Sequence, residues 1–315
     1  MSRIIVASQL QDAFNAAIAE RVADVEIVPA PPGPPPTLPG GAEVFIAAPF
    51  RKAGGALPTR PPKGWPFDLR WIQLVSVGTD FYPRWLFEGP VVTSARGSSA
   101  VALAEYCLAA ILSAAKRMPE IWIHSSAEWT PTPLGLVDGT TLGLVGFGAV
   151  GEALAPRARA LGMTVIASRR SDTPIPVDGV ERVPTDEVFA RADHVVLAAP
   201  ATPETTGLVN HRRLALARRG LHLINIARGA LIDDAALLRA LDNGSVGLAT
   251  LDVTHPEPLP DGHGFYSHPR VRLSPHTSVF TPDTRQKLAS QFAENLDRFR
   301  RGEPLLNVVD PQRGY

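Results

Sequence analysis

Short apolar runs alternate with amphipathic stretches along this chain. In the first third, such runs are bounded by polar or turn-forming residues, which is typical of buried strands. The strands predicted in this first series are residues 3–8, 25–30, 42–48 and 70–78. After the first of them, apolar residues recur at helical spacing, at Leu10, Phe14, Ile18 and Val22. Strands that alternate with helices and loops predict a parallel α/β sheet.

A second alternating series begins near residue 141. It opens with the predicted strand "TTLGLVGFG", the predicted helix "AVGEALAPRARALG" and the predicted strand "MTVIAS". Further strands are predicted at residues 192–200, 221–227 and 246–253. Because the elements alternate here as well, this series predicts a second parallel sheet.

Two long helices are predicted outside the two series. Residues 98–118 are apolar on nearly all faces, which indicates burial beyond the contacts of one domain. The helix at residues 281–302 has one apolar face, formed by Leu288, Phe292, Leu296 and Phe299. The predicted fold class is α/β: two Rossmann-like domains with parallel sheets, joined by these two interdomain helices, with the active site in the cleft. The proline-rich segment 30–41 lies inside the first series, so a surface loop is favoured over a partner-binding polyproline segment.

Composition narrows the possible partners. Lys+Arg and Asp+Glu both number 31, so the formal net charge is zero and gives no reason to expect nucleic acid or an anionic membrane as partner. The single cysteine, Cys107, excludes an intrachain disulfide framework, fits a reducing compartment and is expected to pack in the core. The N-terminus lacks the apolar region of a signal peptide, and the most apolar stretch is too short for a membrane span and contains Glu105. We therefore expect a cytoplasmic protein.

The segment "GFGAVG" follows an apolar predicted strand and opens a predicted helix. Its spacing is that of the dinucleotide-binding fingerprint, in which Gly146 permits a tight turn, Gly148 lets a pyrophosphate approach the backbone and Gly151 lets the helix pack close to the strand. The helix N-terminus supplies amide hydrogens for the phosphates. A turn that merely needs glycines is the alternative. The predicted cofactor-binding residues of this loop are Gly146, Phe147, Gly148, Ala149, Val150 and Gly151.

The segment "ASRRS", residues 167–171, closes the next predicted strand. NAD-specific sites carry Asp or Glu at this strand end, where the carboxylate binds the ribose 2′-hydroxyl. Here Arg169 takes that place, and an arginine can pair bidentately with a 2′-phosphate. We therefore predict that NADP(H) is preferred over NAD(H) and contacts Ser168, Arg169 and Arg170. The alternative is that both arginines are solvated surface charges.

Three downstream segments change the prediction from binding to catalysis: "LINIARGALIDDAAL", "LDVTHPEPLP" and "LSPHTS". Together with "GFGAVG", "VSVGTD" and "AEYCLAAIL", they resemble in order the motifs of the D-2-hydroxyacid dehydrogenase family. The strand end that bears the arginines is most similar to the NADP-dependent glyoxylate/hydroxypyruvate reductases. The resemblance implies a substrate-binding domain, residues 1–94 completed by 284–315, and a dinucleotide-binding Rossmann domain, residues 95–283.

The resemblance also implies catalytic roles. The arginine of the "N-x-A-R-G" motif, Arg228, matches the residue that binds the substrate carboxylate and keto oxygen, as a guanidinium fork at a strand end can. His276 matches the proton donor, and histidine exchanges protons near neutral pH. Glu257 matches the residue that pairs with this histidine. Taken singly, each of the three has a structural alternative, as a salt-bridge partner or an ordinary loop residue.

Further contacts follow from the same resemblance. Val77 and Gly78, beside Ser76, match the loop whose amides receive the substrate carboxylate, although a plain strand-ending turn is the alternative. Thr206 lies in a segment that lines the cofactor groove in the family, although a helix cap is the alternative. Phe50 and Arg51 are candidates for side-chain selectivity. The other predicted cofactor contacts are Pro200, Thr206, Ala227 and Asp252. The remaining histidines fit no metal-ligand spacing, so no metal is predicted.

These observations predict an NADP(H)-dependent reduction of small 2-keto acids to D-2-hydroxy acids by direct hydride transfer. The alternative, on the same fold, is a dinucleotide-sensing binding protein like the transcriptional corepressors. The intact set of Arg228, Glu257 and His276 does not separate the two. A homodimer built through the helix 98–118 is expected from the apolar character of that helix, and the family resemblance implies the same.

Overall fold

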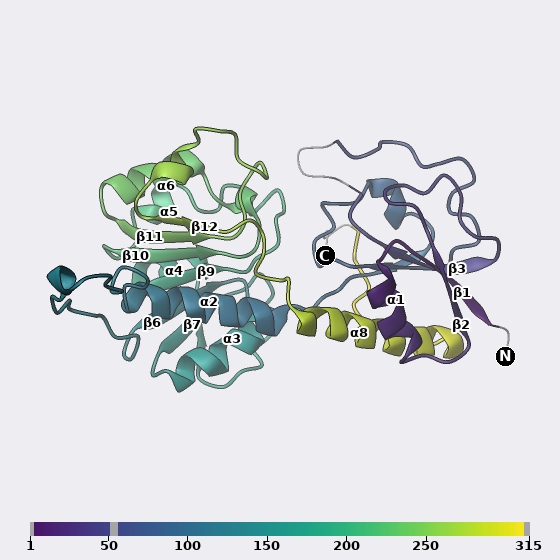
Figure 1. Cartoon of the computed structure of the whole chain (residues 1–315), viewed down its shortest axis with the longest axis horizontal. Coiled ribbons are helices and arrows are strands. Elements are labelled where there is room, and N and C mark those ends of the chain that lie inside the picture. Colours follow the sequence, from purple (N-terminus) through teal and green to yellow (C-terminus); the bar gives the residue numbers. More distant parts are fainter. Residues whose placement is uncertain (1–2, 51–55, 312–315) are drawn as a thin grey trace. The chain divides into compact units, whose positions relative to one another are not determined.

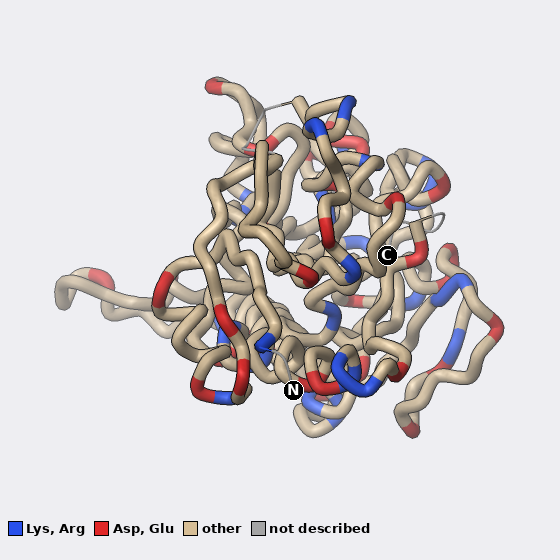
Figure 2. The backbone as a smooth tube through the Cα atoms, turned by 90° about the vertical axis from the view of Figure 1, so that its right-hand side faces the viewer, with Lys and Arg blue, Asp and Glu red and all other residues tan. Residues whose placement is uncertain are grey.

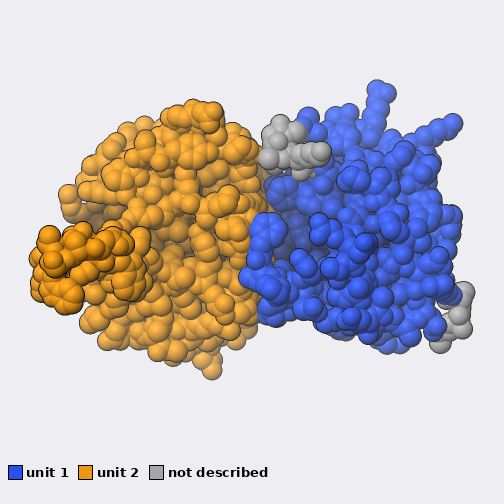
Figure 3. All heavy atoms as spheres, viewed as in Figure 1, with its two compact units in different colours: residues 1–99, 280–315 blue, residues 100–279 orange. Residues whose placement is uncertain are grey.

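The computed structural model describes residues 3–50 and 56–311. It divides into two compact units, which Figure 3 colours separately. Unit 1 comprises residues 1–99 and 280–315, and unit 2 comprises residues 100–279. Each unit is built on its own parallel sheet with helices against it, so the predicted α/β fold class with two Rossmann-like sheets is confirmed (Figure 1).

The sheet of unit 1 has the strand order β2-β1-β3-β4-β5, and every pairing is parallel. Its strands are β1 (Ile4–Ser8), β2 (Val25–Pro29), β3 (Ala42–Ala47), β4 (Trp71–Leu74) and β5 (Val91–Thr93). Its helices are α1 (Asp12–Ala19), the short 3-10 helix η1 (Arg84–Phe87) and α8 (Pro282–Arg301). All four residues of β4 are buried, as expected for an inner strand of a parallel sheet.

Helix α8 begins and ends where its sequence predicts. The Thr281 side chain caps the amide of Thr284, and Gly302 ends the helix in the left-handed conformation with a φ of 66°. The predicted apolar face is confirmed, because its residues pack in the core of unit 1: Leu288, Phe292, Leu296 and, partly buried, Phe299. Phe292 stacks on Trp71 of β4 with ring centroids 4.9 Å apart, which fixes α8 against the sheet.

The sheet of unit 2 has the strand order β12-β11-β10-β9-β6-β7-β8, again wholly parallel. Its strands are β6 (Thr141–Val145), β7 (Thr164–Ser168), β8 (Val180–Arg182), β9 (His194–Leu197), β10 (Leu221–Asn225), β11 (Val246–Leu251) and β12 (Val271–Leu273). The strand order reverses between β6 and β9. In open α/β sheets, ligands bind at the carboxyl ends of the strands at such a switch point.

Helices cover both faces of this sheet (Figure 1). They are α2 (Ala100–Ala115), α3 (Ala149–Ala160), α4 (Thr185–Arg191), α5 (His211–Leu214), α6 (Asp234–Asp242) and α7 (Gly264–Ser267), with the short 3-10 helices η2 (Ser126–Glu128) and η3 (Gly229–Leu231). Cys107 of α2 is fully buried, so its predicted core position is confirmed, and burial raises the pKa of its thiol. Only part of α2 is buried this deeply, since Leu108 and Leu112 remain half-exposed.

The remaining features of the fold concern the segment 30–41, the charges, the helix lengths and the selectivity candidates. The segment 30–41 contains neither helix nor strand, in agreement with the predicted loop, and Gln9 holds it by donating to the Gly33 carbonyl at 2.6 Å. Positive and negative residues are interspersed along the chain (Figure 2). Within the described residues, no helix has the length and apolar character of a membrane span. Phe50, a candidate for selectivity, is buried against Tyr82 and Trp85, whereas Arg51 lies outside the described residues.

Candidate active site

The glycine loop connects β6 to α3 at the switch point of the unit 2 sheet. Gly146 has a φ of 95°, and a Cβ there would lie 2.7 Å from the backbone nitrogen of Ala199, so a side chain does not fit. Gly148 is the N-cap of α3 without a side-chain cap, and a Cβ there would meet nothing within 4 Å. A Cβ at Gly151 would lie 2.9 Å from the Phe147 ring, so a side chain does not fit there, and the predicted role of Gly151 in bringing the helix close to the strand stays a prediction. The open space at the first amides of α3 fits a pyrophosphate.

A pocket of about 460 Å³ lies at the carboxyl ends of β7 and β8. Its lining residues are Ser168, Arg169, Arg182, Val183, Pro184 and Thr185. Arg169 directly follows β7, and its Nη1 donates to the Pro174 carbonyl at 3.2 Å. Ser168 is buried, whereas Arg170 is exposed and is not among the lining residues. The structure therefore brings two of the three predicted residues of "SRR" to this pocket.

The loop that carries Arg228 follows β10 and is held by Asn225, which is fully buried. The Asn225 side-chain Nδ2 donates to the Arg228 carbonyl at 2.9 Å, and its Oδ1 accepts from the backbone N–H of Ala227 at 3.1 Å. Arg228 Nη1 donates to the Ala227 carbonyl at 2.7 Å. A Cβ on Gly229 would collide with the backbone at Thr254, so only glycine lets this loop pack against the loop that follows β11.

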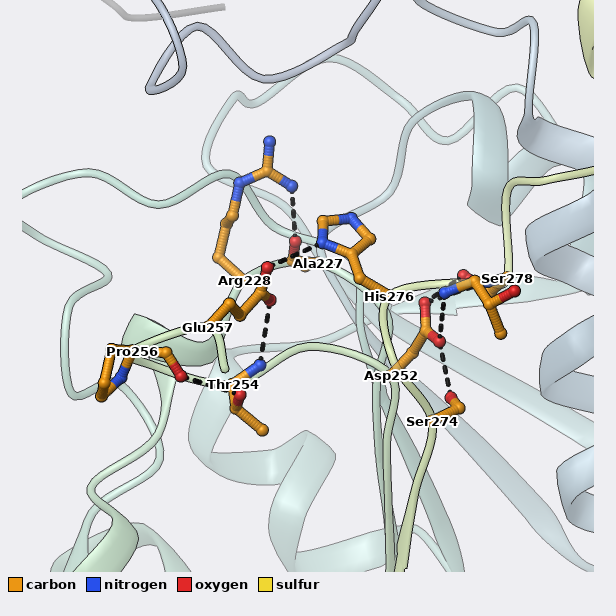
Figure 4. Close-up of polar contacts among 10 residues, drawn as sticks. Ala227, Arg228, Asp252, Thr254, Pro256, Glu257, Ser274, His276 and Ser278 are labelled. Atoms are coloured by element: carbon orange, nitrogen blue, oxygen red, sulfur yellow. Dashed lines mark hydrogen bonds and ion pairs between the residues drawn. The ribbon is translucent and has the colours of Figure 1, made fainter. Parts of the chain in front are cut away.

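His276 and Glu257 form a hydrogen-bonded pair at the same edge of the sheet (Figure 4). His276 Nδ1 lies 3.0 Å from Glu257 Oε2, and the Thr254 amide donates to Glu257 Oε1 at 3.1 Å. Burial raises the pKa of the half-buried Glu257 carboxyl, but the hydrogen bond and charge of His276 act in the opposite direction. Together with smaller contributions from the Thr254 amide and the Arg228 charge, they hold that pKa below its ordinary value.

Asp252, directly after β11, organises the loop that carries His276. Its carboxylate accepts hydrogen bonds from the Ser274 and Ser278 hydroxyls and from the amides of Thr277 and Ser278, and its carbonyl accepts from the His276 amide at 2.8 Å. The residue is only 1% exposed. Asp252 therefore has a structural role that the sequence analysis did not assign, and its predicted cofactor contact stays a prediction.

Comparison with known proteins identifies the family to which this architecture belongs. The family model described as "D-isomer specific 2-hydroxyacid dehydrogenase, NAD binding domain" matches residues 108–278, more than half of the chain. The chain belongs to the D-isomer specific 2-hydroxyacid dehydrogenase family. The family resemblance predicted from the sequence is thereby confirmed.

Individual relatives of this dehydrogenase family agree with the model match. Glyoxylate/hydroxypyruvate reductase A of Serratia proteamaculans (strain 568) is 34% identical over 281 residues, which cover 84% of this chain and 88% of the relative. D-3-phosphoglycerate dehydrogenase of Bacillus subtilis (strain 168) is 36% identical over 231 residues, 70% of this chain but only 43% of that longer protein. The crystal structure of a D-isomer specific 2-hydroxyacid dehydrogenase from Xanthobacter autotrophicus Py2, in complex with NADPH and MES, has a TM-score of 0.81 and 27% identity and covers 100% of both chains.

The remaining predicted residues of this family member lie in loops of both units. Val77 is exposed and Gly78 half-buried, in the loop of unit 1 after β4, where the Ser76 hydroxyl donates to the Gly78 carbonyl at 2.8 Å. Pro200 and Thr206 are exposed in unit 2. Residues 201–208 contain no helix, so Thr206 is not a helix cap; its hydroxyl instead donates to the Thr202 carbonyl at 2.9 Å. Within the described residues, no group of three His, Cys, Asp or Glu side chains is arranged to hold a metal ion.

Sequence reasoning missed the residues that support the site without being candidates for contact with a ligand. Asn225, Ser274 and Ser278 were not assigned a role, although the first belongs to the quoted "N-x-A-R-G" motif and the other two flank His276 in "LSPHTS". The only available signal was the repeated presence of short hydrogen-bonding side chains beside the candidate residues. Their partners are distant in sequence, and a local pattern does not identify them.

Proposed function

We propose that the protein is an NADP(H)-dependent reductase of small 2-keto acids, of the glyoxylate or hydroxypyruvate type, that forms D-2-hydroxy acids. The observation that carries the proposal is the hydrogen-bonded pair of His276 and Glu257 beside the loop of Arg228 (Figure 4). A protonatable imidazole held by a carboxylate, next to a guanidinium that can bind an anion, suits the reduction of a keto acid. Membership of the 2-hydroxyacid dehydrogenase family supports the same reaction class.

In this proposal, Arg228 binds the substrate carboxylate and polarises the keto oxygen. When bound, the reduced nicotinamide supplies a hydride to the carbonyl carbon. His276 donates a proton to the oxygen from Nε2, because Nδ1 already faces Glu257. Glu257, ionised at neutral pH, favours the protonated imidazole and fixes its orientation. Val77 and Gly78 would offer backbone amides to the substrate carboxylate.

The residues present fit a dinucleotide with a 2′-phosphate. The glycine loop leaves open space at Gly148, where a pyrophosphate can reach the first amides of α3. Arg169 lines the adjoining pocket and offers a positive charge where an acidic residue would repel a phosphate. The structural relative from Xanthobacter autotrophicus Py2 was solved with NADPH, which supports the proposed preference.

The proposal includes a homodimer built through α2. A groove of about 910 Å³ runs beside this helix, and its lining includes Tyr106, Ala110, Met118 and Leu136. Large apolar side chains on the segment after α2 are exposed, with Trp129 79% and Leu136 70% accessible. A second copy that covers these residues would remove them from water, as their apolar character favours. A cytoplasmic location, suggested by the single reduced Cys107, is also part of the proposal.

The test is steady-state kinetics with a panel of 2-keto acids and both reduced cofactors. We expect turnover with small keto acids and about 10- to 150-fold higher kcat/KM with NADPH than with NADH. Arg169→Asp should sharply lower the use of NADPH and change that of NADH less. Tight NADPH binding without turnover on any keto acid would instead support a dinucleotide-sensing protein. Equal use of both cofactors would reject the cofactor assignment.

A further inference from the structure

The pocket after β7 contains a second cation that the glycine motif does not predict. Arg182 is the last residue of β8, the strand that pairs with β7 at the edge of the unit 2 sheet. In the register of this pair, Arg182 lies opposite Ala167, and the next amide, that of Val183, donates to the Ala167 carbonyl at 2.9 Å. The parallel pairing thus places Arg182 beside the strand end that delivers Arg169, and both arginines line the pocket.

We propose that Arg182 is a second residue that determines cofactor specificity, by contacting the 2′-phosphate of NADP(H). This inference rests on the proposed function and extends it to a residue on another strand. A phosphate monoester carries close to two charges and three acceptor oxygens, so it can engage two guanidinium groups at once. None of the six lining residues is acidic, and the one carboxylate bound to Arg182, that of Asp172, is not among them.

Arg182 is paired with an exposed carboxylate, which a bound phosphate can replace. Arg182 Nη2 lies 2.7 Å from Asp172 Oδ1, and the Asp172 side chain is fully exposed, with an accessibility of 101%. An exposed ion pair of this kind is weak, because water screens it and Asp172 can rotate into solvent. A bound 2′-phosphate therefore competes with the Asp172 carboxylate for Arg182. The Asp172 carboxylate is expected to reduce the affinity for the 2′-phosphate.

The experiment measures binding of adenosine 2′,5′-bisphosphate and of 5′-AMP by calorimetry, and kcat/KM with NADPH and NADH. The proteins are wild type, Arg182→Ala, Arg182→Gln and Asp172→Asn. Arg182→Ala and Arg182→Gln should lower the affinity for the bisphosphate and kcat/KM with NADPH by about 10-fold. The affinity for 5′-AMP and kcat/KM with NADH should stay within about twofold of wild type. Asp172→Asn should strengthen the bisphosphate by about two- to threefold, because it removes the competing carboxylate.

Arg191→Ala is the matched control. Arg191 is an exposed arginine paired with Glu181, the residue before Arg182, but it does not line the pocket. Removal of this side chain should change the affinity for neither the bisphosphate nor 5′-AMP. The inference would be overturned if both Arg182 variants lost equal affinity for the bisphosphate and for 5′-AMP, or if neither variant lost affinity. A lower affinity of Asp172→Asn for the bisphosphate would refute the competition between Asp172 and the phosphate. If wild type binds the bisphosphate no better than 5′-AMP and Arg169→Asp changes nothing, the proposed NADP(H) preference itself fails, which is a distinguishable result.

Discussion

The backbone of His276 has a φ of 50°, in the left-handed region that residues with side chains rarely adopt. Such a conformation persists only when neighbouring contacts impose it, and it is common at functional sites. Here the contacts come from Asp252 and its hydrogen bonds to residues 276–278. This backbone turn directs the imidazole toward Glu257.

At the residue scale, the first prediction concerns the proton donor. His276→Gln should lower turnover by about 100-fold or more, the usual contribution of a positioned acid, because glutamine cannot donate a proton to an alkoxide. Binding of NADPH should stay nearly unchanged, because the substitution leaves intact the glycine loop and the pocket at the carboxyl ends of β7 and β8. Stopped-flow turnover and fluorescence titration of NADPH measure the two quantities. Near-normal turnover would reject the assignment.

The second residue-scale prediction concerns pH. The pKa of Glu257 lies below its ordinary value, so its carboxylate is ionised throughout the neutral range. Glu257→Gln removes the charge that favours the protonated imidazole. In this variant, the fall of kcat/KM for keto acid reduction with rising pH should begin at a lower pH than in wild type. At pH 7, kcat/KM should be about 10-fold lower than in wild type. An unshifted profile of kcat/KM against pH would contradict the role of the pair.

At the element scale, strand ends decide where the site lies. Arg228 follows β10, Asp252 follows β11 and His276 follows β12. Because the three strands are parallel neighbours, their carboxyl ends meet at one edge of the sheet. Three strands were not predicted, namely β5, β8 and β12. Each has three residues and ends the strand order of its sheet, and so short a run has no clear periodicity.

The prediction at this scale is that Asp252 couples β11 to the loop of His276. Asp252→Asn should lower the free energy of unfolding by about 2 kcal/mol, because the asparagine NH2 would face donors that the carboxylate accepts from. Turnover should fall as well, because the loop that carries His276 loses its support. Urea unfolding and kinetics measure both effects. Asp242→Asn, on the exposed end of α6, is the control and should change neither quantity. Wild-type stability in Asp252→Asn would refute the coupling.

At the scale of the whole molecule, the exposed apolar surface near α2 predicts self-association. Light scattering at micromolar concentration should give twice the chain mass of 33.7 kDa. Leu136→Asp, which places a charge among the lining residues of the groove, should shift the protein toward monomer. Leu216→Asp, at an exposed leucine that does not line the groove, should leave the mass unchanged. A monomeric wild type would reject the dimer.

The sequence by itself determined the longer strands, the two long helices, the glycine loop and the family, because these depend on local periodicity and on motifs read within one segment. It also indicated Arg228, Glu257 and His276 as a set. The tertiary structure alone brought together Glu257 and His276, which are 19 residues apart, and made Asn225 and Asp252 the supports of two loops. It also placed Arg182 beside Arg169. Those neighbours depend on strand pairing and on backbone conformations such as the left-handed His276, which arise from packing between distant segments.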